Sequence, residues 1–249
     1  MSGARAARLL AAAILVAAAA GADSAGRAEP PNPAEYAAAV RRTVSGATVH
    51  AVLGPDVIPL PIAASNFLLD HPDLSAFIVN REKIAPYKIE MLSARRSLAD
   101  DGDGTEGVLN LLERTGRHRL YYGEGVHHSR VFPDIRAAAV ISMDLSAAAG
   151  PDGGERTMTT FRVWVRIKSR FVAGLVRTLR PFLRGVVVRK FSKAFTVAES
   201  TGRFLARDPG AAAADVDAFP GLHPEERAEI LAMISRLKKS PLSAAPAGR

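Results

Sequence analysis

The stretch from Thr157 to Ala206 constrains the fold of this chain most, because its hydrophobic period changes along it. Apolar residues first stand at alternate positions: Phe161, Val163, Val165 and Ile167. Between them stand Arg162, Trp164, Arg166 and Lys168, and a period of two is typical of a half-buried strand. From residue 171 the apolar residues recur every three or four positions, which indicates a helix. The stretch therefore predicts a sheet edge that delivers the chain to a helix lying back across the sheet.

The helical part changes character near its middle. Its apolar arc comprises Phe171, Val172, Leu175, Val176, Leu179, Phe182, Leu183 and Val186, and the opposite arc carries Arg170, Arg177, Arg180 and Arg184. Beyond Gly185 the pattern inverts: Arg189, Lys190 and Lys193 take the angles of the earlier apolar residues, and Phe191 and Phe195 take the basic side. Pro181 lacks a backbone donor. We expect a break near Pro181 or Gly185, with a short helix before it and a longer one ending near Ala206.

Basic charge is concentrated in the same region. Residues 162–207 contain twelve Lys and Arg residues and one acid, Glu199, so this segment carries +11. The whole chain carries +8, so the remainder sums to −3. The excess suggests an anionic partner such as a membrane surface, and Arg177, Arg180 and Arg184 are the candidate contacts. The alternative is a solvated helix face. Aromatic residues are only 6% of the chain, which makes binding of nucleic acid by base stacking an unfavoured function.

The N-terminus resembles a secretory signal in composition. Arg5 and Arg8 precede an apolar run from Leu9 to Ala20, and the small residues up to Ala22 suit a cleavage site. The run is short for a membrane span, although an uncleaved anchor or buried helix is the alternative. We expect cleavage after Ala22 and export to the periplasm or medium. The chain has no cysteine, which excludes disulfides and thiolate chemistry.

The rest of the chain predicts an antiparallel α+β domain between linkers. Residues 23–33 form a linker, and Asn32-Pro33 then begins a helix. A short strand at 48–53, interrupted by Gly54-Pro55, precedes a helical pair at 62–69 and 74–79. Five strands joined by turns follow, beginning at Tyr87 and near residues 108, 117, 135 and 157. We expect a domain over 34–207, a linker over 208–223, a helix over 224–239 and a disordered tail over 240–249.

This order of elements is that of a helix-grip fold. The stretch from Ile62 to Ala206 resembles the START-like, polyketide-cyclase/Bet v 1-type (SRPBCC) superfamily. The helical pair at 66–74 (Asn-Phe-Leu-Leu-Asp-His-Pro-Asp-Leu) and the strand at 161–165 (Phe-Arg-Val-Trp-Val), which feeds the C-terminal helix, carry the resemblance. The weak strand before the helical pair and Pro181 in the last helix depart from the family pattern.

The resemblance implies a sheet wrapped around the C-terminal helix, with a cavity between them for an apolar small molecule or lipid. The expected lining residues are Phe67, Tyr87, Ile89, Met91, Leu120, Tyr122, Ile141, Met143, Phe161, Val163, Val165, Leu175, Leu179 and Leu183. The alternative is that these side chains pack on one another as a dry core.

Candidate catalytic and metal-binding residues are few, and no cofactor or metal is expected. His127 and His128 are adjacent on a strand and so point to opposite faces. Asp101, Asp103 and Glu106 lack the ligand spacing of a calcium loop. Glu113 and Glu124 are acid–base candidates only if they face the cavity; the alternative is that they are exposed or paired with Arg117 or Arg119.

Three functions remain open. The first is an exported, non-catalytic protein that carries or senses an apolar molecule. The second is a cyclase- or hydrolase-type enzyme, which requires ionisable residues converging in the cavity. The third is an envelope interaction module that uses its basic helix face, with a filled core. The sequence leaves the ligand and the oligomeric state undetermined. We also expect Trp164 on the outer face of its strand, because it alternates with the inward Phe161 and Val163.

Overall fold

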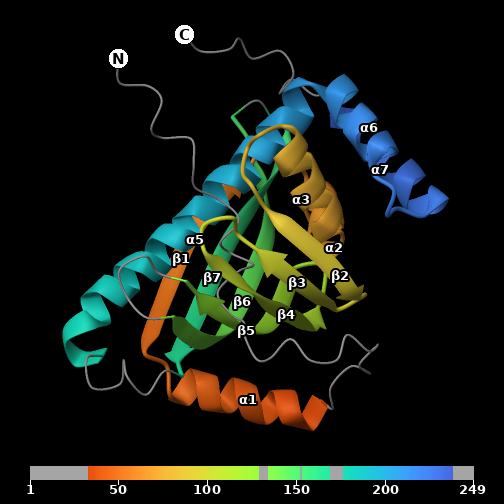
Figure 1. Ribbon diagram of the computed structural model, residues 1–249. Coiled ribbons are helices and arrows are strands. Elements are labelled where there is room, and N and C mark those ends of the chain that lie inside the picture. The colour runs from red at the N-terminus through yellow and green to blue at the C-terminus, as the bar shows by residue number, and fades with distance from the viewer. Residues whose placement is uncertain (1–32, 129–133, 152, 169–175, 238–249) are drawn as a thin grey trace, which may run out of the picture.

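A computed structural model describes residues 33–128, 134–151, 153–168 and 176–237. These residues form an α+β structure with six helices and one seven-stranded antiparallel sheet (Figure 1). The strands are β1 (Val49–Ile58), β2 (Lys88–Ser93), β3 (Arg96–Asp100), β4 (Thr105–Arg114), β5 (His118–His127), β6 (Ile135–Ala149) and β7 (Glu155–Ile167). The helices are α1 (Pro33–Ser45), α2 (Ile62–Asp70), α3 (Pro72–Arg81), α5 (Val176–Arg207), α6 (Pro209–Ala218) and α7 (Pro224–Leu237).

The sheet has the strand order β1-β7-β6-β5-β4-β3-β2, and every neighbouring pair is antiparallel. The last strand in sequence therefore lies beside the first, while β2 forms the opposite edge. The helical pair α2–α3 lies in the connection between these two edges, β1 and β2. The antiparallel sheet and the helical pair expected from the sequence are confirmed.

The inner face of the sheet is covered by α5, which crosses it obliquely (Figure 1). Phe161 on β7 is buried, and its ring centroid lies 5.0 Å from that of Phe195 and 6.0 Å from that of Phe191, both on α5. Val163 and Val165 share this face and are also buried. The alternation predicted for the stretch is therefore correct, and it sets the register against α5.

Helix α1 covers the outer face at β6 and β7 (Figure 1). Tyr36 of α1 packs edge-on against Tyr122, with centroids 5.7 Å apart, and its hydroxyl donates to Asn110 Oδ1 at 2.6 Å. Trp164 is half-buried in this outer cluster and stacks on His50 at 5.1 Å. The predicted outward position of Trp164 is confirmed.

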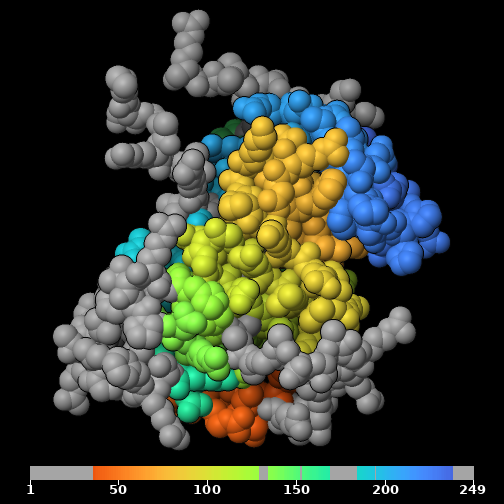
Figure 2. All heavy atoms as spheres, viewed as in Figure 1, coloured from red at the N-terminus to blue at the C-terminus, as the bar shows by residue number. Residues whose placement is uncertain are grey.

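A second apolar core lies where α2 and α3 meet the end of α5, α6 and α7. Leu74, Ile78, Leu205, Ile230 and Ile234 are all buried in it. In Figure 2 the orange-yellow atoms of α2–α3 and the blue atoms of the C-terminal helices lie against one another. The C-terminal helices therefore support the helical pair from outside the sheet.

The predicted linker over 208–223 is wrong in its first part, which forms α6. The Asp208 side chain accepts a hydrogen bond from the Ala211 amide at 3.0 Å, and Pro209 occupies the start of the helix. Both are favoured at a helix N-terminus. The buried Ala212 and Val216 then join the second core.

The predicted break in the long helix is also wrong, because α5 runs without interruption from Val176 to Arg207. Pro181 lacks a backbone donor, but it does not end this helix. The inverted pattern beyond Gly185 has another explanation. Phe191 and Phe195 face the sheet, while Lys190 and Lys193 are buried beside Asp101 and Asp103.

The sheet has two strand features that the sequence did not predict. Residues 88–100 form a hairpin of β2 and β3 rather than one strand. Strand β1 continues through Gly54-Pro55, where the register against β7 shifts and the peptide bond is cis. A bulge lets an extended pair continue past residues that cannot fit the regular ladder.

The outer boundaries of the expected domains are described only in part. Helix α7 ends at Leu237. The expected signal segment 1–22, the linker up to residue 32 and the tail 240–249 lie outside the described residues. Within the described ranges, no helix has both the length and the apolar character needed to cross a membrane.

Candidate functional site

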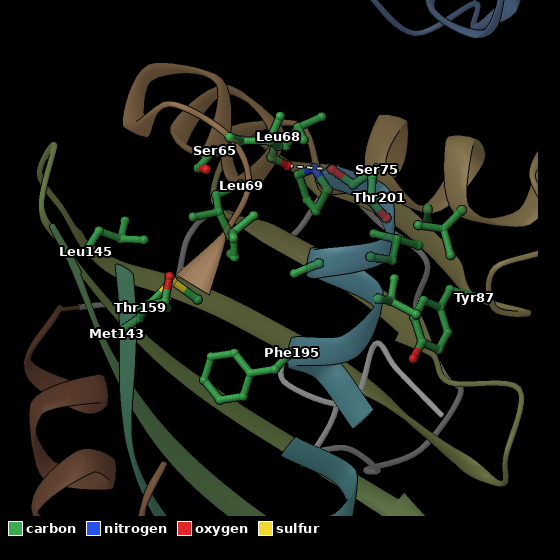
Figure 3. A pocket seen from close by; sticks show the side chains of 18 of the residues that line it. Ser65, Leu68, Leu69, Ser75, Tyr87, Met143, Leu145, Thr159, Phe195 and Thr201 are labelled. Atoms are coloured by element: carbon green, nitrogen blue, oxygen red, sulfur yellow. Dashed lines mark hydrogen bonds between the residues drawn. The ribbon is translucent and has the colours of Figure 1, made fainter. Parts of the chain in front are cut away.

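A pocket of about 150 Å³ lies between the inner face of the sheet, the helical pair and the C-terminal half of α5 (Figure 3). The helices contribute Ser65, Leu68, Leu69, Pro72, Ser75, Ala76, Val79, Phe195, Val197, Ala198 and Thr201. The strands and loops contribute Ile58, Leu60, Tyr87, Ile89, Met143, Leu145, Thr159 and Phe161.

The lining is apolar apart from a few hydroxyl groups. Among the described residues that line it, none is an Asp, Glu, His, Lys or Arg. A charged group enters an apolar interior only with a compensating partner. The described wall therefore suits a neutral guest and offers no carboxylate or imidazole for acid–base chemistry.

Hydrogen bonds fix the helical pair over the sheet at the rim of this pocket. The hydroxyls of Ser65 and Thr157 lie 2.8 Å apart, and Thr157 Oγ1 donates to the Leu60 carbonyl at 2.8 Å. Ser75 Oγ donates to the Leu68 carbonyl at 2.7 Å, which ties α3 to α2. These hydroxyls serve the fold, and they hold the pocket open by fixing α2 against β7.

Two further hydroxyls differ from these. Thr159 on β7 is 2% exposed and Thr201 on α5 is 5% exposed. Within the described residues, neither Oγ1 has a hydrogen-bond partner. Figure 3 shows Thr159 beside Met143 on the sheet side and Thr201 near Ser75 on the helix side. A buried hydroxyl without a partner is uncommon in native proteins.

Only some of the predicted lining residues reach the pocket. Tyr87, Ile89, Met143 and Phe161 line the pocket. Ile141, Val163 and Val165 share the inner face but belong to the core beneath α5. Phe67 packs in the second core, and Met91 lines a neighbouring hollow with Arg95 and Arg114. Leu175 lies outside the described residues, as do the side chains of Leu179 and Leu183.

Two of the predicted lining residues lie on the wrong face. Leu120 and Tyr122 pack in the outer cluster beneath α1. Inward positions on β5 are held instead by Arg119 and Tyr121, opposite Met143 and Ile141 of β6. Alternating apolar residues show that one face of a strand is buried, but they do not show which face. On β5 the apolar residues Leu120 and Tyr122 face α1.

Sequence reasoning missed the threonines and the α5 residues of the pocket. Thr159 shares the parity of Phe161, so the alternation carried a signal for its inward position. Phe195 was expected on the basic side of a broken helix. Because α5 is continuous, Phe195, Val197 and Thr201 instead reach the sheet and the helical pair.

A buried hydrogen-bond network lies under α5, away from the pocket. Lys190 Nζ donates to Asp101 Oδ2 at 2.5 Å and to Thr105 Oγ1 at 2.8 Å. An ammonium group can only donate, so the Thr105 hydroxyl accepts from Lys190 and donates to His127 Nδ1, 2.9 Å away. Burial and the charge of Lys190 lower the pKa of His127. This network holds the β3–β4 turn against α5.

A second buried cation lies where α2 meets β5. Arg119 is 1% exposed; its Nη1 lies 2.5 Å from Asp70 Oδ1, and its Nη2 donates to Asn66 Oδ1 at 2.9 Å. Arg114 Nη2 approaches the other oxygen of Asp70 at 2.8 Å. Burial raises the pKa of the nearby Tyr121 to about 12. The cluster fixes the C-terminal end of α2 over the sheet.

The structure separates the predicted histidine and acidic candidates. His127 faces Thr105, whereas His128 is exposed between Asp134 and Glu106, consistent with opposite faces. Glu124 lies on the outer side, where it contacts Lys168 at 2.6 Å.

Glu113, the other acid–base candidate, is exposed. Neither of the two glutamates lines the pocket. In the part of the chain that the structure describes, no three His, Asp or Glu residues gather as a metal ion would require.

Of the three arginines proposed for an anionic surface, Arg184 is exposed on α5. Arg177 and Arg180 stand on the same helix, and their side chains lie outside the described residues.

Comparisons with known proteins identify no family for this chain. No protein-family model and no curated protein matches the chain. Among solved structures it is similar to a conserved protein from Geobacillus kaustophilus, with 14% sequence identity and a TM-score of 0.39. That similarity covers 61% of this chain and 95% of the other.

Proposed function

We propose that this chain is an exported, non-catalytic binding protein of the helix-grip, START-like type, which carries or senses an apolar molecule in the pocket between sheet and α5. The observation that carries this is the pocket itself, an apolar hollow whose lining comes from β1, β2, β6, β7, α2, α3 and α5 together. Protein interiors are normally packed without voids of this size. A concave, mostly apolar hollow with a few polar groups is the expected form of a ligand site.

The order of elements supports the helix-grip assignment. A strand, a helical pair, an antiparallel meander and a long final helix follow one another from β1 to α5. Strands β1 and β7 lie side by side, and α5 packs across the inner face. The site then lies where the fold brings the helical pair, the sheet and the last helix together.

The composition of the wall favours binding over the enzyme alternative. A cyclase or hydrolase on this fold needs two or more ionisable groups at the reacting atoms. The described lining supplies hydroxyls only. The interaction-module alternative requires a filled core, which the pocket of about 150 Å³ disfavours.

The binding proposal is tested by filling the pocket. Ala76 on α3 and Ala198 on α5 both line it, so the double variant Ala76→Leu/Ala198→Leu removes volume without adding polarity. Native mass spectrometry of the wild type, purified without added ligand, should show a non-covalent adduct that the double variant lacks. Ala232→Leu, at an exposed position of α7, is the matched control. Adducts of equal abundance in all three proteins would refute the assignment to this pocket.

Export is tested separately. The charged and apolar order of residues 1–22 supports cleavage after Ala22, which would make Asp23 the first residue of the mature chain. N-terminal sequencing of the protein from the periplasmic or culture fraction should find this start within a few residues. Exported protein that still begins at Met1 would contradict the proposal.

A further inference from the structure

We infer that the ligand of this pocket is a small neutral molecule, about the size of one six-membered ring, whose hydroxyl or carbonyl group hydrogen-bonds Thr159 or Thr201. The inference rests on the proposed function and narrows it. Instead of any lipid or apolar molecule, the expected ligand is a small neutral ring compound with a hydroxyl or carbonyl group.

Size sets the first limit. A cavity of about 150 Å³ lined by aliphatic and aromatic residues accommodates a molecule such as benzene. The pocket here has that volume. Sites for larger ligands enclose about 300 Å³ or more. A lipid with two acyl chains would therefore extend well beyond the described walls.

Charge sets the second limit. The described lining contains no ionised side chain that could neutralise a buried carboxylate or ammonium group. The buried cations of the described residues are already engaged: Arg119 contacts Asp70 and Asn66, and Lys190 contacts Asp101 and Thr105. Lys193 contacts Asp103. A charged guest would lose its hydration without compensation. The ligand is accordingly neutral when bound.

The two threonines supply the polar contact. The other Ser and Thr hydroxyls at the rim are occupied, because Ser65 pairs with Thr157 and Ser75 donates to Leu68. Thr159 and Thr201 are buried, line the pocket from the sheet and from α5, and have unpartnered hydroxyls among the described residues. A hydroxyl both donates and accepts, so it can serve a ligand alcohol or a ligand carbonyl.

The test compares three probes of one shape at pH 7: toluene, p-cresol and p-toluate. NMR titration of the full chain gives each dissociation constant. We expect the wild type to bind p-cresol roughly fivefold more tightly than toluene, as one neutral hydrogen bond provides. We expect p-toluate to bind at least about a hundredfold more weakly than p-cresol, because its charge would be buried without a partner.

Variants then assign the contact. In Thr159→Val/Thr201→Val the order should reverse, with toluene the tighter ligand, because the phenol hydroxyl would be buried without a partner. The single variants show which threonine acts. Thr196→Val, an exposed threonine on α5 that bonds only its own helix, is the control and should leave every constant unchanged.

The outcomes separate the two levels of the proposal. Toluene binding as tightly as p-cresol in the wild type, or p-toluate binding most tightly, would overturn this inference and leave the binding function standing. Binding of none of the probes would overturn both. Should the double variant not fold, the wild-type ranking of the three probes still decides.

Discussion

Lys190 Nζ lies 2.5 Å from Asp101 Oδ2, and the Asp101 side chain is fully buried while that of Lys190 is 10% exposed. The two residues are 89 positions apart, and their contact joins α5 to the turn between β3 and β4. Asp101 Oδ1 also accepts from the amides of Asp103 and Thr105, at 2.7 and 2.9 Å. The carboxylate is thus fully satisfied, and it organises the turn as well as the contact with the helix.

Removing one partner of this pair should be costly. Lys190→Met leaves the Asp101 charge buried without compensation, and we expect a loss of about 3–5 kcal/mol in the free energy of unfolding. Asp101→Asn/Lys190→Met, with no buried charge, should lose less than the sum of the two single variants. Urea denaturation measures each value. Arg203→Met, which breaks an exposed pair with Glu199 on the same helix, is the control and should cost about 0.5 kcal/mol or less. Equal losses for Lys190→Met and the control would show that the buried pair does not stabilise the fold.

The same pair predicts an acid-dependent loss of stability. Burial alone would raise the pKa of Asp101, but the hydrogen bond and charge of Lys190 and the amides of Thr105 and Asp103 outweigh it and lower the pKa below 3.8. An acid whose folded-state pKa is depressed stabilises the fold above its unfolded pKa. That contribution is lost as pH falls through the folded value.

Unfolding free energies from pH 6 to pH 2 test this. The difference between the wild type and Asp101→Asn should be largest above about pH 5 and should shrink as pH falls below about 4. A difference that stays constant over this range would contradict the lowered pKa of Asp101.

The sequence predicts those features of the fold and the pocket that are determined by residues close together in the chain. The alternation around Phe161 and the start of α7 at Pro224, with acidic residues in its first turn, depend on neighbouring residues, and both elements form as expected. The turn at 94–95 contains Ala and Arg rather than Gly or Pro, so it gave no turn signal and the β2–β3 hairpin was missed.

The errors in the long helix and the pocket have non-local causes. Lys190 and Lys193 looked misplaced on an apolar face because their partners, Asp101 and Asp103, are about ninety residues away. Leu120 and Tyr122 were assigned inward because the sequence did not show that α1 covers the outer face. The unpartnered hydroxyls of Thr159 and Thr201 depend on the packing of three elements and have no signature in the sequence.

Two threonines on β7 should respond in opposite ways to the same substitution in the ligand-free protein. Thr157 and Thr159 share a face, but within the described part of the chain only the Thr157 hydroxyl has partners, Ser65 and Leu60. Thr157→Val should cost about 1–3 kcal/mol, because it leaves buried partners unsatisfied. Thr159→Val should cost nothing, and it should gain up to about 1 kcal/mol because an unpaired buried hydroxyl is removed. Urea denaturation of both variants measures the sign. A loss for Thr159→Val as large as that for Thr157→Val would mean that the Thr159 hydroxyl is satisfied in the free protein.

The basic face of α5 gives the last prediction. If Arg177, Arg180 and Arg184 bind an anionic membrane, each should contribute about 1 kcal/mol near such a surface. Together they would provide about 3 kcal/mol, or on the order of a hundredfold in affinity. Replacing all three with Gln should therefore nearly abolish flotation with anionic liposomes at low salt. Gln is a good helix former, so α5 should persist.

A matched control separates location from total charge. Arg41, Arg95 and Arg117 are exposed outside α5, and changing these three to Gln alters the net charge equally. If the α5 face is the contact, this control should float almost as the wild type does, and neutral liposomes should bind none of the proteins. Equal losses in both triple variants would indicate attraction by net charge alone. Equal flotation of the wild type and the α5 variant, or no flotation of either, would reject membrane binding by these arginines. They would then form a solvated helix face, where charges need no binding partner.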